Sequence, residues 1–244
     1  MIPVHSTIPP QRVPMVNYTL IGTNLAFFIY ETTLGTRIEP FVLTYGWVPA
    51  SFFHTLALGQ VPGLTPLLVS MFLHGSWLHL FGNLLYLHIF GDNVEDRLGA
   101  VRYLCFYCLG GIVAVLVQTC IAPSAHTPMI GASGAIAAVA GAYWVFYPTG
   151  RVLTVVPLIF SFRLVQVPAA CYLLVWLLVQ VFLGLYAFFL EGGQLPGGAW
   201  GAHLGGFVAG LVFAPLFLFK KKRRSRRSWF RSSLLWQEPR SVLR

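Results

Sequence analysis

Six apolar stretches dominate the chain, separated by shorter connections that contain polar residues, prolines and glycines. Their lengths lie at or near the roughly 17 to 25 residues that a helix needs to cross a bilayer. The pattern predicts an all-α polytopic membrane protein, in which a six-helix domain over 16–219 lies between an N-terminal segment, 1–15, and a tail, 220–244. The predicted spans are 16–32, 76–90, 101–121, 131–147, 167–190 and 199–219.

The composition agrees with a chain that lies mostly in lipid. Of its 244 residues, 57% are hydrophobic and 9% charged, so it lacks the polar surface of a soluble globule. The formal net charge is +9, and seven basic residues lie between Lys220 and Arg227, directly after the last apolar stretch. Such a cluster is typical of a juxtamembrane segment. We therefore expect the tail to contact anionic lipid rather than nucleic acid.

The basic residues of the connections predict the orientation of the chain. Five of them fall on the side of the two termini, and only Arg37 falls on the other side. Because cytoplasmic loops carry an excess of Lys and Arg, both termini are expected in the cytoplasm. No removable signal peptide or targeting signal is evident, which favours a plasma (inner) membrane of a prokaryote. The five residues are Arg12, Arg97, Arg102, Arg151 and Arg163.

The fourth stretch begins with a hydroxyl among residues that have almost no side chains. Gly131, Ala132, Ser133 and Gly134 place a serine at the first turn of a helix, where it could attack a carbonyl carbon beside backbone N–H groups. At about 25 Å, the stretch is shorter than a hydrocarbon core of about 30 Å. Its start is therefore expected below the membrane surface, beside a water-filled cavity or under protein. The small residues could alternatively serve only close helix packing.

The sixth stretch supplies a base for this serine. His203 lies near its start, on the same side of the membrane as Ser133, and Gly206 and Gly210 offer a smooth face for the fourth stretch. A serine hydroxyl needs a base to take its proton, and neutral histidine is the usual one. Neither stretch contains Asp or Glu. The pattern therefore predicts a Ser133–His203 dyad whose imidazole is oriented by packing or by another polar group.

The second stretch adds hydrogen-bond donors. His79 and Asn83 are four residues apart, hence on one helix face, and His74 precedes them. At the level of Ser133 they could stabilise an oxyanion together with the Ser133 amide. A metal site formed by His74, His79 and His203 is the alternative, but no carboxylate or His-Glu-x-x-His spacing supports it. We predict neither a metal nor a cofactor.

Together, three groups of residues resemble the rhomboid family of intramembrane serine proteases in its prokaryotic six-helix form. The resemblance implies a serine nucleophile at the top of a short fourth helix and a histidine base on the sixth. It also implies that His79 and Asn83 help to form the oxyanion hole, with His74 at the start of the same helix. The bacterial form has an aromatic residue four positions after the serine, where this chain has Ala137. The groups are His74, His79 and Asn83; Gly131, Ser133 and Gly134; and Ala202, His203, Gly205 and Gly210.

The expected activity is hydrolysis of peptide bonds in or near the transmembrane segments of single-span membrane proteins. Two alternatives stay open at this point. One is a catalytically silent rhomboid-like protein that binds membrane clients, and the other is a channel or carrier that uses His79, Asn83 and His203 as a polar path. No particular oligomeric state is predicted.

Overall fold

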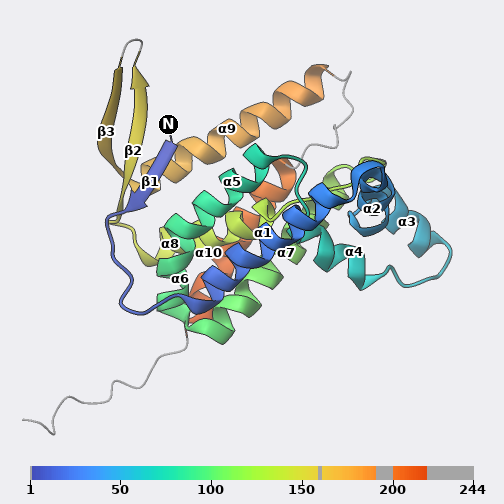
Figure 1. Ribbon diagram of the computed structural model, residues 1–244, viewed down its shortest axis with the longest axis horizontal. Helices are drawn as coiled ribbons and strands as arrows, with labels where there is room; N and C mark the ends of the chain where they lie inside the picture. Colours follow the sequence, from blue (N-terminus) through green and yellow to red (C-terminus); the bar gives the residue numbers. More distant parts are fainter. Residues whose placement is uncertain (1, 159–160, 191–199, 219–244) are drawn as a thin grey trace, which may run out of the picture.

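The computed structural model describes residues 2–158, 161–190 and 200–218, and it is mainly helical (Figure 1). Each of the six apolar stretches is helical, and the second continues beyond its predicted end at residue 90 to Leu98. In chain order the helices are α1 (Met15–Thr33), α5 (Trp77–Tyr86) with a short π-helix (Leu87–Gly91) and α6 (Asp92–Leu98), α7 (Ala100–Ile121), α8 (Ser133–Phe146), α9 (Ala169–Leu190) and α10 (Trp200–Phe217).

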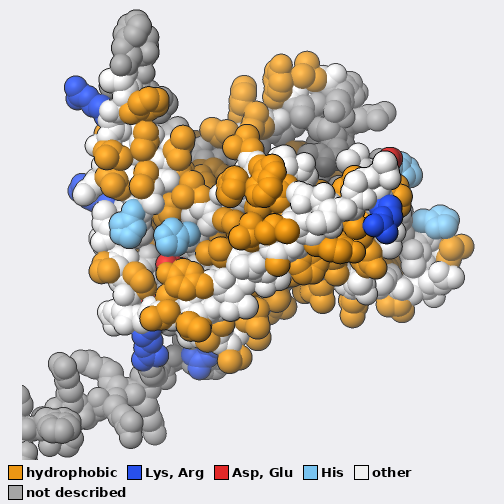
Figure 2. All heavy atoms as spheres, viewed as in Figure 1, with side chains coloured by type: hydrophobic (Ala, Val, Ile, Leu, Met, Phe, Trp, Pro, Cys, Tyr) orange, Lys and Arg blue, Asp and Glu red, His pale blue; other side chains and the backbone are white. Residues whose placement is uncertain are grey.

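Several of these helices are fit to cross a bilayer. By length and hydropathy α7, α9 over Ala169–Tyr186, and α10 qualify among the described residues. A fourth candidate is the pair Leu64–Phe72 and Trp77–Leu98, whose two parts meet at 89°. Figure 2 shows hydrophobic side chains over the middle of the molecule, while the Lys and Arg side chains in view lie toward its ends. This distribution is that of a protein surrounded by lipid.

Helix α8 forms the centre of the bundle, and glycines bring α10 against its backbone. At Gly206 and Gly210 an added Cβ would overlap the carbonyl oxygens of Gly134 and Ala138. The prediction that Gly206 and Gly210 pack on the fourth stretch is therefore confirmed. Helix α8 has 14 residues, which gives it a length of about 21 Å.

A three-stranded antiparallel sheet corrects the prediction of an all-α protein. Its strands are β1 (Ile2–Ser6), β2 (Arg151–Leu158) and β3 (Ser161–Pro168), in the order β1-β2-β3. Ile2 pairs with Val155, so the N-terminal segment, 1–15, supplies one strand of this sheet. The run from Arg151 to Leu158 is rich in β-branched residues, but a lone strand is unstable without partners from distant parts of the chain.

The long connection after α1 folds into short helices at the end opposite the sheet (Figure 1). They are α2 (Ile38–Tyr45), α3 (Pro49–Ala57) and α4 (Leu64–Val69), with single 3-10 turns at Gly35–Arg37 and Ser70–Phe72. Trp47 and Met129 exchange two backbone hydrogen bonds of 3.0 and 2.7 Å. This connection thereby fixes the segment that leads into α8.

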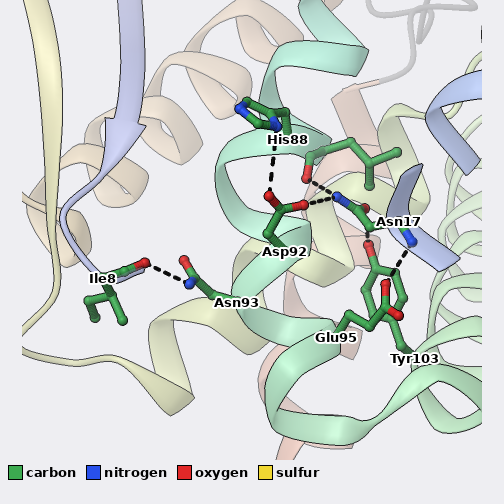
Figure 3. A network of polar contacts seen from close by, with 8 residues as sticks. Ile8, Asn17, His88, Asp92, Asn93, Glu95 and Tyr103 are labelled. Atoms are coloured by element: carbon green, nitrogen blue, oxygen red, sulfur yellow. Dashed lines mark hydrogen bonds and ion pairs between the residues drawn. The ribbon is translucent and has the colours of Figure 1, made fainter. Parts of the chain in front are cut away.

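A buried polar network joins the start of α1 to α6 and α7 (Figure 3). The Glu95 carboxylate accepts the backbone N–H groups of Val16 and Asn17, at 3.1 and 2.7 Å. The Asn17 side chain donates to Asp92 at 2.6 Å and accepts from the Tyr103 hydroxyl at 2.6 Å. Because the side chains of Asn17, Asp92, Glu95 and Tyr103 are all buried, the network holds these three helices together at the end that carries the sheet.

Candidate active site

A cavity of about 240 Å³ opens between four helices and contains the main residues singled out in the sequence. Helix α5 contributes His79 and Asn83, α8 contributes Ser133, and α10 contributes His203. Segments that are far apart along the chain thus meet at one site. The full lining is Leu78, His79, Gly82, Asn83, Tyr86, Ser133, Ile136, Trp176 and His203.

Ser133 is the first residue of α8, and the backbone before it is held tightly. Gly131 has a φ of +123°, which favours glycine, and its N–H donates to the Ser70 carbonyl at 2.8 Å. A Cβ on Gly131 would lie 2.7 Å from Nε2 of His79, so this glycine lets the His79 ring approach the backbone beside Ser133. Gly134 likewise leaves no space for a side chain against Ala114 of α7. The two supporting glycines therefore have a steric role.

His203 is the fourth residue of α10, and its two ring nitrogens have different surroundings. Nδ1 lies 2.7 Å from Oε1 of Gln180, on α9. Nε2 is buried and has no hydrogen-bond partner among the described residues, Ser133 included. In an enzyme without substrate the bond between nucleophile and base is often long, and it shortens when the substrate binds. Nδ1 of His203 is therefore held by Gln180, whereas Nε2 has no hydrogen-bond partner among the described residues.

His74 lies outside the cavity lining but is bonded to Asn83, which belongs to it. The Asn83 side-chain amide donates to Nε2 of His74 at 3.0 Å, so this nitrogen must carry a lone pair. Nδ1 of His74 then bears the hydrogen and donates to the Phe72 carbonyl at 3.1 Å. Both ring nitrogens are thus used in protein hydrogen bonds. Its backbone N–H also donates to the buried Glu31 carboxylate at 3.1 Å.

Two residues beside His203 were missed in the sequence, Gln180 and Trp176. The Trp176 ring centroid lies 5.7 Å from that of His203, on the helix that carries Gln180. Ala137 is buried in α8 at the contact with Gly206, so the aromatic neighbour of the histidine comes from α9 instead. The sequence did contain a signal for Gln180, because it is the only amide or charged side chain within 169–190.

Gln118 is a further polar residue that sequence reasoning missed. It lies in the last turn of α7, and its Oε1 accepts the backbone N–H of Ala202 at 3.1 Å. This N–H belongs to the first turn of α10, where helix geometry leaves the amide without an internal partner. Gln118 therefore fixes the start of the helix that carries His203.

The candidate site lies within a region that matches a known protein family. The family described as Rhomboid domain matches residues 62–220, which include His79, Asn83, Ser133 and His203. Similar proteins include the mitochondrial presenilin-associated rhomboid-like protein of Bos taurus, 31% identical over 100 residues, which are 40% of this chain and 26% of that protein. RHOMBOID-like protein 5 of Arabidopsis thaliana is 27% identical over 161 residues, which are 63% of this chain and 44% of that protein.

The chain spans less than half the length of these relatives. Its apolar helices and its match to the family make it a multi-pass membrane protein. The matched region contains the three groups of residues on which the sequence resemblance rests. The chain belongs to the rhomboid family.

Proposed function

We propose that the chain is an intramembrane serine endopeptidase that cleaves single-span membrane proteins in or near their transmembrane segments. The observation that carries the proposal is the cavity shared by Ser133 and His203, in which the base has an unpaired Nε2. Helix α8 is short, which supports a serine below the membrane surface with water supplied through the cavity.

In the proposed reaction, Nε2 of His203 takes the proton of Ser133 as the serine oxygen attacks the substrate carbonyl carbon. The peptide C–N bond then breaks, and the imidazolium returns the proton to the leaving amine. An acyl-enzyme remains on Ser133. Water, deprotonated by His203, attacks the ester carbonyl, and Ser133 leaves with the proton. No cofactor takes part in these steps.

The oxyanion of each tetrahedral intermediate would be stabilised by the Ser133 backbone N–H, His79 and Asn83. An amide group has two N–H hydrogens, and Asn83 uses one of them on His74. The second hydrogen is left for a substrate oxygen. In this proposal His74 acts through Asn83, because its Nε2 fixes the direction of the amide.

In the proposed arrangement the chain crosses the plasma (inner) membrane six times. Both of its termini then lie in the cytoplasm. This arrangement is supported by the positions of the sheet and of α2 to α4 at opposite ends of the molecule (Figure 1). The predicted tail, 220–244, lies outside the described residues. Its basic cluster would contact anionic lipid headgroups.

The test is cleavage of a panel of single-span reporter proteins by purified protein in detergent and in liposomes. We expect Ser133→Ala and His203→Ala each to reduce kcat by more than about 1,000-fold, because each removes a group that takes part in the reaction. Ser51→Ala is the matched control, since Ser51 is an exposed serine of α3 outside the cavity. It should cleave like the wild type.

A second readout is labelling of Ser133 by a fluorophosphonate probe, which needs an activated serine but no reporter. If the folded wild type neither cut any reporter nor reacted with the probe, the proposal would be wrong. The alternative of a catalytically silent, client-binding rhomboid-like protein would then be favoured.

A further inference from the structure

We infer that Gln180 is a positioning residue that holds His203 in the tautomer able to act as a base. The inference rests on the proposed function, since it assigns a role in the same reaction. It concerns a residue of α9, a helix that contributes neither the nucleophile nor the base. Three observations carry it: the hydrogen bond to His203, the way α9 is packed, and the chemistry of the surrounding helices.

The hydrogen bond determines which ring nitrogen bears the proton. An amide oxygen can only accept, so Nδ1 of His203, 2.7 Å from Oε1 of Gln180, must carry the hydrogen. In the neutral ring, Nε2 then has the lone pair. Nε2 is also the nitrogen without a partner, at a residue that lines the cavity with Ser133. The bond therefore leaves the free nitrogen ready to accept a proton.

Packing of α9 holds Gln180 at this position. Tyr172, Trp176, Gln180 and Gly184 are four residues apart and form one stripe along the helix. One turn before Gln180, the Trp176 ring lies against His203, and two turns before it the Tyr172 hydroxyl lies 2.6 Å from that of Tyr86. One turn after it, an added Cβ on Gly184 would overlap the Trp200 ring. The stripe is thus packed against other helices both before and after Gln180 along the chain.

An amide suits this place better than a carboxylate. Helices α8, α9 and α10 contain no Asp or Glu, and many of the large side chains of α9 off the stripe are exposed and apolar. A charge buried in such surroundings would be costly, whereas an amide can accept the Nδ1 hydrogen without one. Gln180 therefore provides the orientation that a carboxylate provides in a Ser-His-Asp triad.

Because of this hydrogen bond, the orientation of His203 depends on the position of α9. Because the acceptor lies on α9 and the histidine on α10, the hydrogen bond lasts only while the two helices are packed together. Displacement of α9 would remove the bond and leave the imidazole free to change its tautomer and its direction. The proposed active site is therefore complete only when α9 is in place.

Variants of Gln180 test the role through kcat. Gln180→Met keeps the length of the side chain but loses the acceptor, and we expect kcat to fall about 10- to 100-fold with little change in KM. Gln180→Glu keeps an acceptor oxygen, because a carboxyl group that takes up a proton in these apolar surroundings carries no charge and its carbonyl oxygen still accepts the Nδ1 hydrogen. This variant should recover most of the wild-type kcat. The control is Val179→Met, which places the same side chain at a lipid-exposed position one residue away. A folded Gln180→Met protein with wild-type kcat, or a Gln180→Glu protein no better than Gln180→Met, would overturn the inference.

The tautomer can be measured directly, in the wild type and without any turnover. Ring-nitrogen NMR shifts of protein labelled in histidine, with His203→Ala used to identify the signals, should show the proton on Nδ1. Gln180→Met should lose this preference. A proton on Nε2 in the wild type would refute the inference even if the protein cleaves its reporters. A folded protein that neither cleaves a reporter nor reacts with the fluorophosphonate probe would overturn the proposed function, while its NMR signals would still decide the role of Gln180.

Discussion

His74 and Asn83 show how backbone atoms can set the chemistry of a side chain several residues away. The Phe72 carbonyl takes the Nδ1 hydrogen of His74, which leaves Nε2 as an acceptor for the Asn83 amide. The Glu31 carboxylate, which belongs to α1, accepts the backbone N–H of His74. Asn83 is consequently fixed by a chain of hydrogen bonds that begins outside the cavity.

The oxyanion role of Asn83 predicts a specific kinetic defect. Asn83→Ala should lower kcat about 100- to 1,000-fold with a small change in KM, because the donor acts on charge that develops in the transition state. His74→Ala, which only releases Asn83, should lower kcat about 10- to 100-fold. Both effects are measurable with the reporter assay. Phe81→Ala, at an exposed apolar residue of α5 outside the cavity lining, is the control and should keep the wild-type kcat. Wild-type kcat in folded Asn83→Ala would exclude the role.

Residue types alone identified the candidates Ser133, His203, His79 and Asn83, because polar groups in apolar stretches are uncommon. The structure brings these four to one cavity, and their catalytic roles stay predictions. Gln180 has the same kind of signal, yet its partner could not be inferred. The contact depends on how α9 is rotated against α10, and no local pattern encodes that rotation.

At the scale of elements, α1 depends on a distant residue for the capping of its first turn. Pro14 precedes the helix and makes no side-chain capping bond. The N–H groups of Val16 and Asn17 are satisfied by Glu95 from α6 instead (Figure 3). A carboxylate near a helix N-terminus is also favoured by the helix dipole. Glu95, which follows the second predicted stretch, 76–90, therefore has a structural role.

This cap predicts a loss of stability without loss of chemistry. Glu95→Ala should lower the free energy of unfolding by about 1 to 2 kcal/mol, since the N–H groups of buried Asn17 and partly buried Val16 lose their acceptor. Glu39→Ala, at an exposed acid in the first turn of α2, should change it by less than about 0.5 kcal/mol. Unfolding in mixed micelles with increasing SDS measures both. Equal stability of the two variants would show that the cap is unimportant.

The whole molecule has two different ends. One carries the sheet and the polar network, and the other carries α2, α3 and α4 (Figure 1). If the chain crosses the membrane as proposed, these ends face opposite aqueous compartments. His5 in β1 and Gln60 after α3 are both exposed and can report on the two ends.

We predict that these two positions react from opposite sides of the membrane. In a background without the four native cysteines, His5→Cys should react with an impermeant thiol reagent in inverted vesicles, and Gln60→Cys in intact cells. Treatment after solubilisation in detergent is the control for the reactivity of each thiol. Reaction of both positions from the same side would contradict the proposed topology.

By itself, the sequence determined the six helical stretches, the close contact of Gly206 and Gly210 with α8, and the candidates Ser133 and His203. These features depend on local composition and spacing, because an apolar stretch must be helical in lipid and a glycine face permits close approach. Only the tertiary structure decided the sheet, the Glu95 cap and the contact between Gln180 and His203. Each of these joins residues from distant segments, so its stability comes from a partner that the local pattern does not specify.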